Sequence, residues 1–129
     1  MNFTGIIIEE SLRDKNILKE MKILSTEVER VVGEHKTPWL KQWTMHSVEI
    51  SESQADEVAK KISKALETKH NWYADFKNDN THYIIFRNKV FRVDRAKPEQ
   101  YKKVTEYGVS LGIPDHQLDF SPDIKEWKR

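Results

Sequence analysis

An aspartate and a histidine in the segment from Asn71 to Asp94 have the residue types and the spacing for acid–base chemistry. Asp75 and His82 fall on neighbouring strands of a predicted antiparallel ribbon, on one face, as diagonal neighbours within reach of each other. A carboxylate beside an imidazole can form a general acid–base pair. Catalysis also needs a nucleophile or a water position and a pocket, and the sequence names none of these. A structural hydrogen bond or plain solvation is therefore the favoured interpretation.

Metal and cofactor chemistry has little support in the sequence. With no cysteine, the chain has neither a disulfide framework nor a thiolate metal site. A phosphate-cradling glycine loop, a Walker-type lysine and a GxSxG elbow are also missing from the sequence. The five histidines lack the i to i+4 or HxH spacing of metal ligands, so we expect no metal and no cofactor: His35, His46, His70, His82 and His116.

Basic residues outnumber acidic ones between Arg87 and Lys103. Together with Tyr83, Phe86 and Phe91 they have the composition of a surface that binds single-stranded nucleic acid. No RNP-like motif accompanies them, and the formal net charge of +1 is far from the basic excess of dedicated nucleic-acid binders. A solvated basic edge is the favoured interpretation of these residues: Arg87, Lys89, Arg92, Arg95, Lys97, Lys102 and Lys103.

The elements that would position these side chains are three short strands joined by two tight turns. Asp79-Asn80 and Asn88-Lys89 suit the turns, because Asn and Asp tolerate left-handed backbone geometry. Counting outward from the turns places Phe76 opposite Tyr83 and Asp75 opposite Ile84, and then Arg92 opposite Ile85. Large apolar side chains fall on both faces of this ribbon, so we expect both faces to be covered.

The two faces differ in composition. The second face has the more uniformly apolar centre, and we assign it to a helix-covered core: Ile84, Phe86, Phe91 and Val93. The first face mixes aromatic and basic residues, as interfaces do, which predicts a contact surface: Trp72, Phe76, Tyr83, Ile85 and Arg92. Burial by the chain's own elements, a homo-oligomer contact and a ligand platform stay open as alternatives for this first face. A one-residue change in either turn would exchange the faces.

The rest of the chain predicts an α+β domain with a mainly antiparallel sheet in the order β-β-β-α-β-β-β-α. Apolar residues at helical spacing, with Ser51 and Gln54 as a capping box and a Glu57–Lys61 ion pair, predict a helix over 51–67. Pro98 and Gly112 bound a second helix over 98–111. The remaining strands are predicted over 4–10, 22–32 and 43–50. The strand over 43–50, the helix and the following strands could build a split-βαβ, ferredoxin-like unit.

Length and composition indicate a single domain over 1–120 with a flexible tail over 121–129. The N-terminal run of three isoleucines is followed at once by Glu9 and Glu10, which does not fit a signal peptide. No apolar run approaches the roughly 20 residues that span a bilayer. We therefore expect a cytoplasmic protein with no membrane contact.

Three segments together resemble a family of small bacterial proteins without an assigned activity. They are WYADF at 72–76, HYIIFRNKVFRVD at 82–94 and YGVSLGIPDHQLDF at 107–120, and the loop EHKTPWLKQW at 34–43 is similar to the same group. The resemblance covers most of the chain. It implies a bacterial, cytosolic, single-domain protein, and it transfers no catalytic or binding residue.

Three functional hypotheses follow from these observations. The first is a non-enzymatic domain that self-associates or binds a partner through the aromatic first face. The second is a small-molecule or nucleotide-binding domain, or a cryptic enzyme, with these contributors: Trp72, Tyr73, Asp75, His82 and Arg87. The third, a single-stranded nucleic-acid binder, is disfavoured by the near-neutral charge.

Overall fold

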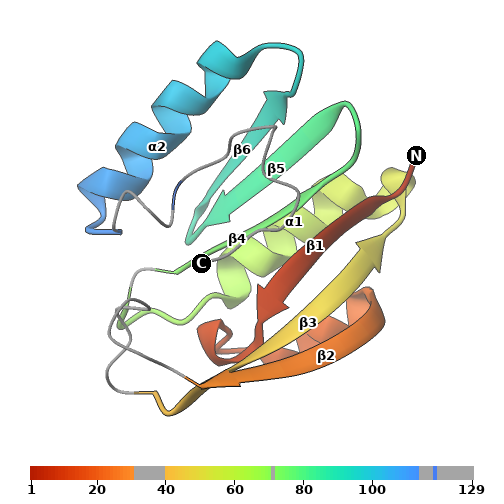
Figure 1. Ribbon diagram of the computed structural model, residues 1–129, viewed down its shortest axis with the longest axis vertical. Helices are drawn as coiled ribbons and strands as arrows, with labels where there is room; N and C mark the ends of the chain where they lie inside the picture. Colours follow the sequence, from red (N-terminus) through yellow and green to blue (C-terminus); the bar gives the residue numbers. More distant parts are fainter. Residues whose placement is uncertain (31–39, 71, 114–117, 119–129) are drawn as a thin grey trace.

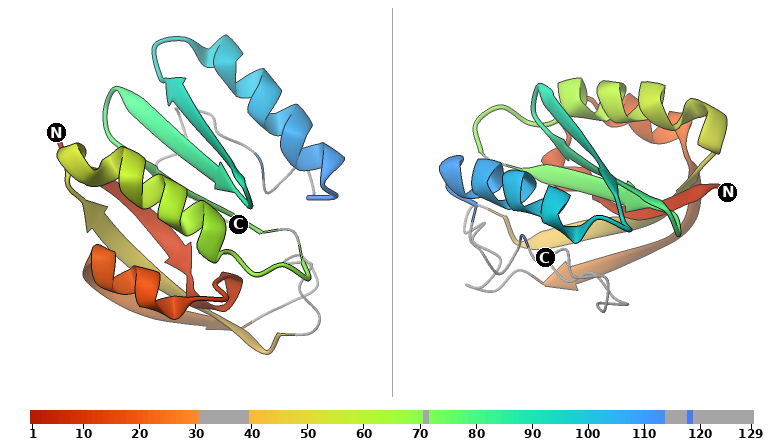
Figure 2. Two further views of the ribbon diagram at one scale, coloured as in Figure 1. Left: turned by 180° about the vertical axis from the view of Figure 1, so that it is seen from behind. Right: turned by 90° about the horizontal axis from the view of Figure 1, so that it is seen from above.

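The computed structural model describes residues 1–30, 40–70, 72–113 and 118. They form a six-stranded sheet that carries one α-helix on each face (Figures 1 and 2). The strands and α-helices are β1 (Phe3–Ile8), β2 (Lys22–Arg30), β3 (Gln42–Ile50), α1 (Ala55–Ala65), β4 (Tyr73–Lys77), β5 (Thr81–Phe86), β6 (Lys89–Asp94) and α2 (Tyr101–Ser110). Short 3-10 turns are η1 (Glu9–Ser11), η2 (Lys15–Glu20), η4 (Glu52–Gln54) and η5 (Pro98–Gln100).

The sheet has the strand order β2-β3-β1-β4-β5-β6, and every neighbouring pair is antiparallel. This confirms the predicted α+β class and the predicted order of elements. The strands β3 and β4 both flank β1 and are antiparallel to it, so they run parallel to each other. Because α1 connects them, β3, α1 and β4 form the expected split-βαβ unit around β1.

Element boundaries differ from the predictions where polar side chains find other partners. The first strand ends at Ile8, because Glu9 and Glu10 turn into η1. The first α-helix begins at Ala55 after the short turn η4. The capping box is wrong: the Ser51 hydroxyl bonds the Gln54 side chain at 3.0 Å and caps no backbone N–H. The predicted tail over 121–129 and most of the loop over 34–43 lie outside the described residues.

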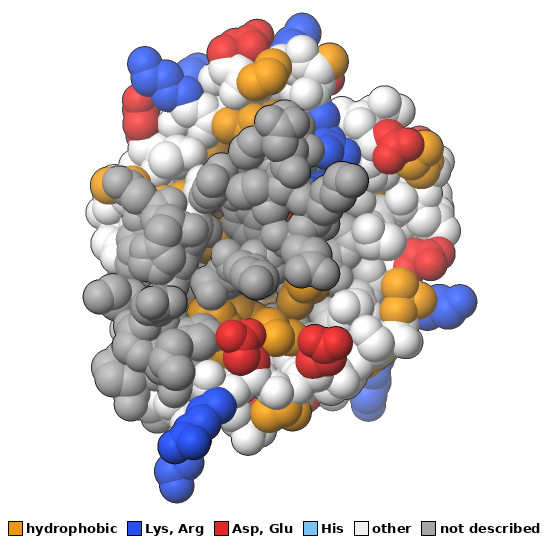
Figure 3. Space-filling view, viewed as in Figure 1, with side chains coloured by type: hydrophobic (Ala, Val, Ile, Leu, Met, Phe, Trp, Pro, Cys, Tyr) orange, Lys and Arg blue, Asp and Glu red, His pale blue; other side chains and the backbone are white. Residues whose placement is uncertain are grey.

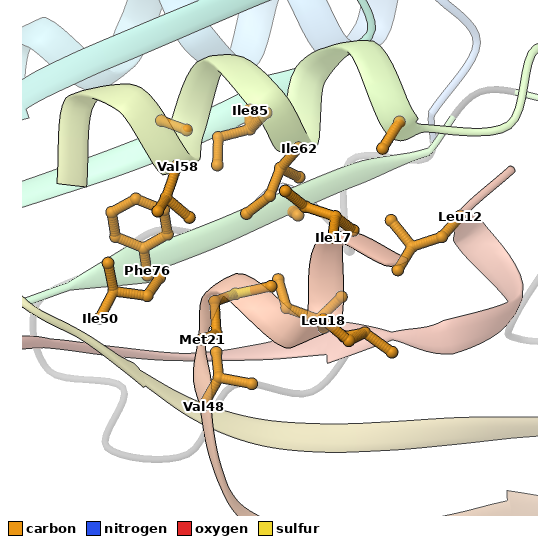
Figure 4. Packing of buried hydrophobic residues seen from close by; sticks show 14 of the residues in the cluster. Leu12, Ile17, Leu18, Met21, Val48, Ile50, Val58, Ile62, Phe76 and Ile85 are labelled. Carbon is orange, nitrogen blue, oxygen red and sulfur yellow. The ribbon is translucent and has the colours of Figure 1, made fainter. Parts of the chain in front are cut away.

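The first face of the ribbon is covered by the chain itself. Val58 and Ile62 of α1 point onto Phe76 and its neighbours in the sheet, and η2 packs beside them (Figure 4). The expected contact surface is therefore corrected: four of its members belong to this core, with exposed fractions of 8% or less, namely Trp72, Phe76, Tyr83 and Ile85. Of the five residues of the expected contact surface, Arg92 alone is exposed. We call this side of the sheet the α1 face.

The second face is covered over β4, β5 and β6 by α2; the sequence predicts a helix on this face but does not say which one. Val104 and Gly108 of α2 are buried, and Tyr101 and Tyr107 pack partly buried against the same cluster. The sheet contributes Tyr73, Ile84, Phe86 and Val93 to this second core. The helix ends before Gly112, whose φ of 91° is in the left-handed region that favours glycine. We call this side the α2 face.

The predicted register of the ribbon is correct in the first hairpin and shifted in the second. Phe76 lies opposite Tyr83, as predicted. In the second hairpin Arg92 lies opposite Tyr83 rather than Ile85, because the turn uses Asn88 with a φ of 61° and is centred one residue earlier. The register shift of two residues is even, so the predicted faces are unchanged. In the described part of the chain no helix is long and apolar enough to cross a membrane.

The centre of the sheet depends on a close approach between β1 and β4. Gly5 lies opposite Phe76 in their antiparallel register. A Cβ built on Gly5 would stand 2.3 Å from the backbone oxygen of Asp75 and 2.8 Å from the Cα of Phe76. Backbone atoms cannot rotate away as a side chain can, so any side chain at position 5 would push the two strands apart.

The variant Gly5→Ala should destabilise the fold by about 1–3 kcal/mol, the usual cost of overpacking. Urea denaturation followed by circular dichroism gives the change in the free energy of unfolding. The matched control is Thr4→Ala on the same strand, because Thr4 is exposed and should change stability by no more than about 0.5 kcal/mol. Equal effects of the two substitutions would contradict a close contact at Gly5.

Candidate functional site

The α2 face carries a chain of three hydrogen-bonded polar side chains. Nε2 of His82 lies 2.8 Å from Oδ2 of Asp75, and Nδ1 of the same ring lies 2.9 Å from the hydroxyl of Tyr101. The exposed fractions of Asp75 and His82 are 5% and 1%. The sequence predicted that Asp75 and His82 could meet, and the structure places them in direct contact. We call these three residues the polar chain.

Three separate elements position the polar chain. Asp75 is in β4 and His82 is in β5, one pair away from directly opposite, since Asp75 faces Ile84 and His82 faces Lys77. Tyr101 begins α2. Tyr101 falls within the helix predicted over 98–111, but the sequence gave no sign of its bond to His82, because that bond depends on how α2 docks on the sheet.

The electrostatics of the polar chain favour neutral tyrosine. Burial raises the pKa of Tyr101, and the guanidinium of Arg95 partly offsets this shift. Arg95 is itself held by a 2.6 Å hydrogen bond that it donates to the backbone oxygen of Asn78. Both nitrogens of the His82 ring already have protein atoms within hydrogen-bond distance. The geometry therefore supports a buried link between the sheet and α2 more directly than it supports a base waiting for a substrate.

The other predicted binding residues do not gather at the polar chain. Tyr73 lies in the core of the α2 face, and Trp72 belongs to the core of the α1 face. Arg87 is exposed in the turn between β5 and β6. A hollow of about 550 Å³ follows the outer side of α2, and it contains none of the five predicted binding residues: it is lined by Lys102, Thr105, Glu106, Val109 and Ser110.

Tyr83 and Arg92, predicted as contact residues, instead interact within the chain. The Tyr83 hydroxyl donates a hydrogen bond to the carboxylate of Asp56 at the start of α1. The guanidinium carbon of Arg92 lies 5.7 Å from the centre of the Tyr83 ring, within the range of a cation–π interaction. Basic side chains on the described part of the face in Figure 3 are interspersed with acidic ones. That distribution does not resemble a continuous basic track for nucleic acid.

A second polar cluster, which the sequence did not reveal, links β2 to β3 near η1. Nδ1 of His46 lies 2.8 Å from the hydroxyl of Thr26, and Nε2 lies 3.2 Å from a carboxylate oxygen of Glu9. Beside it, Glu10 accepts a 2.8 Å hydrogen bond from the hydroxyl of Thr44. Among the described residues no three His, Cys, Asp or Glu side chains come together in a way that could hold a metal.

The edge strand β2 is exposed along its whole length. It pairs with β3 on one side and forms one end of the sheet (Figure 1). All of its residues from Lys22 to Arg30 are exposed. Its three large apolar side chains keep substantial exposed fractions: 44% for Ile23, 50% for Leu24 and 61% for Val28.

The opposite edge, β6, is different. Its apolar residues Val90 and Phe91 pack against the two cores, and Val93 is buried. The residues that remain exposed on β6 are charged, namely Lys89, Arg92 and Asp94. Charged exposed side chains are a common protection of sheet edges, whereas β2 leaves apolar side chains in contact with solvent.

The variant Asp75→Ala should destabilise the fold by about 1–3 kcal/mol, because it removes the carboxylate that accepts from the buried His82 ring. Tyr101→Phe should cost less, about 0.5–1.5 kcal/mol, because its hydroxyl is only partly buried. Urea denaturation measures both. The control Asp79→Ala, in the exposed turn of the same hairpin, should stay within about 0.5 kcal/mol of the wild type. A loss for Asp75→Ala no greater than for the control would exclude a structural role for the polar chain.

The variant Tyr83→Phe should remove a tyrosine that ionises at unusually high pH. Burial, followed by the hydrogen bond to Asp56 and the charge of that carboxylate, raises the pKa of Tyr83 from 10.0 to about 12. The pKa of Tyr83 is higher in the folded than in the unfolded protein, so its neutral phenol contributes to the stability of the fold. This contribution is complete below about pH 10 and is lost as the pH rises through about 12. An ultraviolet absorbance titration of the folded protein should lose its highest-pH component in Tyr83→Phe.

The variant Asp56→Asn serves as the control for this titration. It removes the charge beside the phenol but keeps Tyr83, so the same component should move to lower pH rather than vanish. A titration unchanged in both variants would show that Tyr83 does not interact with Asp56 in solution.

Comparison of the chain with protein-family models, with curated proteins and with solved structures gives no match in any of the three.

Proposed function

We propose that this chain is a protein-binding domain without catalytic activity of its own, and that β2 is its contact element. The observation that carries the proposal is an edge strand of nine residues, all exposed, with three large apolar side chains among them. The aromatic first face of the ribbon does not offer a contact, because its aromatic side chains are buried under α1.

An exposed edge strand offers a defined mode of binding. Its outward N–H and C=O groups can accept a further strand, and the added main-chain hydrogen bonds supply affinity while alternate side chains supply specificity. The strand is held firmly on its inner side, where β2 pairs with β3 from Lys22 to Arg30. The hydrogen bond between Thr26 and His46 adds a side-chain link to that pairing. A rigid, already extended strand loses little conformational entropy when it pairs.

A second candidate function is small-molecule binding or catalysis at the polar chain. The specific observation in its favour is the contact of Asp75 with His82, continued to the partly exposed Tyr101. A substrate would have to engage the Tyr101 hydroxyl, because the imidazole is 1% exposed. The hollow along α2 lacks all three residues, so this candidate is supported less well than binding through β2.

The proposed function predicts that the chain binds a free peptide strand. A fluorescein-labelled peptide with the sequence of residues 22–30 should show a saturable rise in fluorescence anisotropy when the protein is added. The variant Val28→Lys should weaken this binding, because it places a charge among the exposed apolar side chains of β2. Val109→Lys is the matched control: Val109 is 45% exposed on α2, so its substitution should leave peptide binding unchanged.

Two outcomes would contradict binding through β2. One is a flat anisotropy curve for the peptide, equal to that of a scrambled peptide of the same composition. The other is equal weakening by Val28→Lys and Val109→Lys, which would show that the peptide responds to surface charge in general rather than to the edge strand.

A further inference from the structure

We propose that the strand accepted by β2 is the β2 of a second copy of this chain, paired antiparallel about a twofold axis at Thr26. This inference rests on the proposed function and names its partner. It would join two six-stranded sheets edge to edge into one continuous sheet. The support comes from the register of β2, from its exposed side chains and from its charges.

An irregularity in β2 determines which of its side chains share a face. Ile23 lies opposite Val48 of β3, and Ser25 lies opposite Ser47, so the register skips Leu24. Beyond this bulge, Val28 lies opposite Thr44. Because Val48 and Thr44 are four residues apart on β3, they share a face. Ile23 and Val28 therefore also share a face, although they are five residues apart and strict alternation would separate them.

The bulge makes the outer edge of β2 complementary to itself. With Leu24 skipped in both copies, a twofold axis at Thr26 brings Ile23 of one copy opposite Val28 of the other. The same register brings Lys22 opposite Glu29. Symmetry repeats each pair, so the interface contains two apolar pairs and two pairs of opposite charge. All of these residues are exposed in the single chain, and cross-strand pairs of both kinds stabilise sheets.

Neighbouring registers that keep the faces aligned are less favourable. An axis at Ser25 leaves Val28 beyond the end of the paired region. An axis at Glu27 places that carboxylate opposite its own copy, and like charges directly opposite are destabilising. The charged residues of β2 therefore favour the register with the axis at Thr26 over the neighbouring registers of the β2–β2 pair.

The mass of the protein in solution is the first test. Light scattering during size exclusion should give twice the mass of a single chain at micromolar concentration, falling toward the single-chain mass on dilution. Val28→Lys should shift this equilibrium toward the monomer, and Val109→Lys should not.

Disulfide trapping tests the register, and the chain suits it because it has no native cysteine. Residues directly opposite in an antiparallel pair have Cα atoms about 4.5–5.5 Å apart, which a disulfide can bridge. On the proposed axis Thr26 meets its own copy, so Thr26→Cys should form a covalent dimer under mild oxidation. Val28→Cys alone should not, because the two copies of residue 28 lie apart along the strands.

A mixture of Ile23→Cys and Val28→Cys chains should crosslink into a dimer that contains one chain of each kind. This second trap leaves the hydrogen bond between Thr26 and His46 in place, so it stays informative if Thr26→Cys disturbs the strand.

A dimer that neither trap captures would place the interface elsewhere and overturn the inference. A monomer that still binds the peptide of residues 22–30 would overturn self-pairing but leave the proposed function intact. A monomer that does not bind the peptide would overturn both.

Discussion

The pairing of β1 with β4 holds the two halves of the sheet together. The strands β2, β3 and β1 form one half, and β4, β5 and β6 form the other. Their junction is short, with Gly5 at its centre opposite Phe76. The absence of a side chain on Gly5 permits the backbones to approach. The helix α1 reinforces the junction, because its apolar face packs into a single core with residues of both halves, such as Val48 and Ile85 (Figure 4).

This arrangement explains why β4 and β5 carry buried side chains on both faces. Each strand lies between α1 on one side and α2 on the other (Figure 2). A polar residue that points into either layer needs a hydrogen-bonding partner, because an unsatisfied buried group is costly. Asp75 and His82 meet that requirement with each other, and Tyr101 extends the bond to α2. The same geometry that resembles a catalytic pair thus serves to attach the second helix to the sheet.

The two edge strands of the sheet differ in whether their apolar side chains are buried or exposed. At β6 these side chains turn into the cores, and the residues left outside are charged. At β2 Ile23, Leu24 and Val28 belong to neither core and stay exposed. An exposed apolar edge is a liability unless another strand covers it. The bulge at Leu24 aligns the exposed side chains so that a second β2 can do so, which connects an irregularity of the backbone with the proposed interaction.

The sequence by itself determined the α+β class, the order of the elements and the separation of residues between the ribbon faces. These features follow from local periodicity and turn chemistry, which act over a few residues: Val58 and Ile62 fall on one helical stripe whatever they pack against. The tertiary structure decided which layer covers each face, because the placement of α1 and α2 depends on connections along the whole chain. It also decided that β2 lies at an edge of the sheet. Its alternating residues predict a strand, but whether a strand lies at an edge or in the middle depends on pairing with distant segments, which no local pattern records.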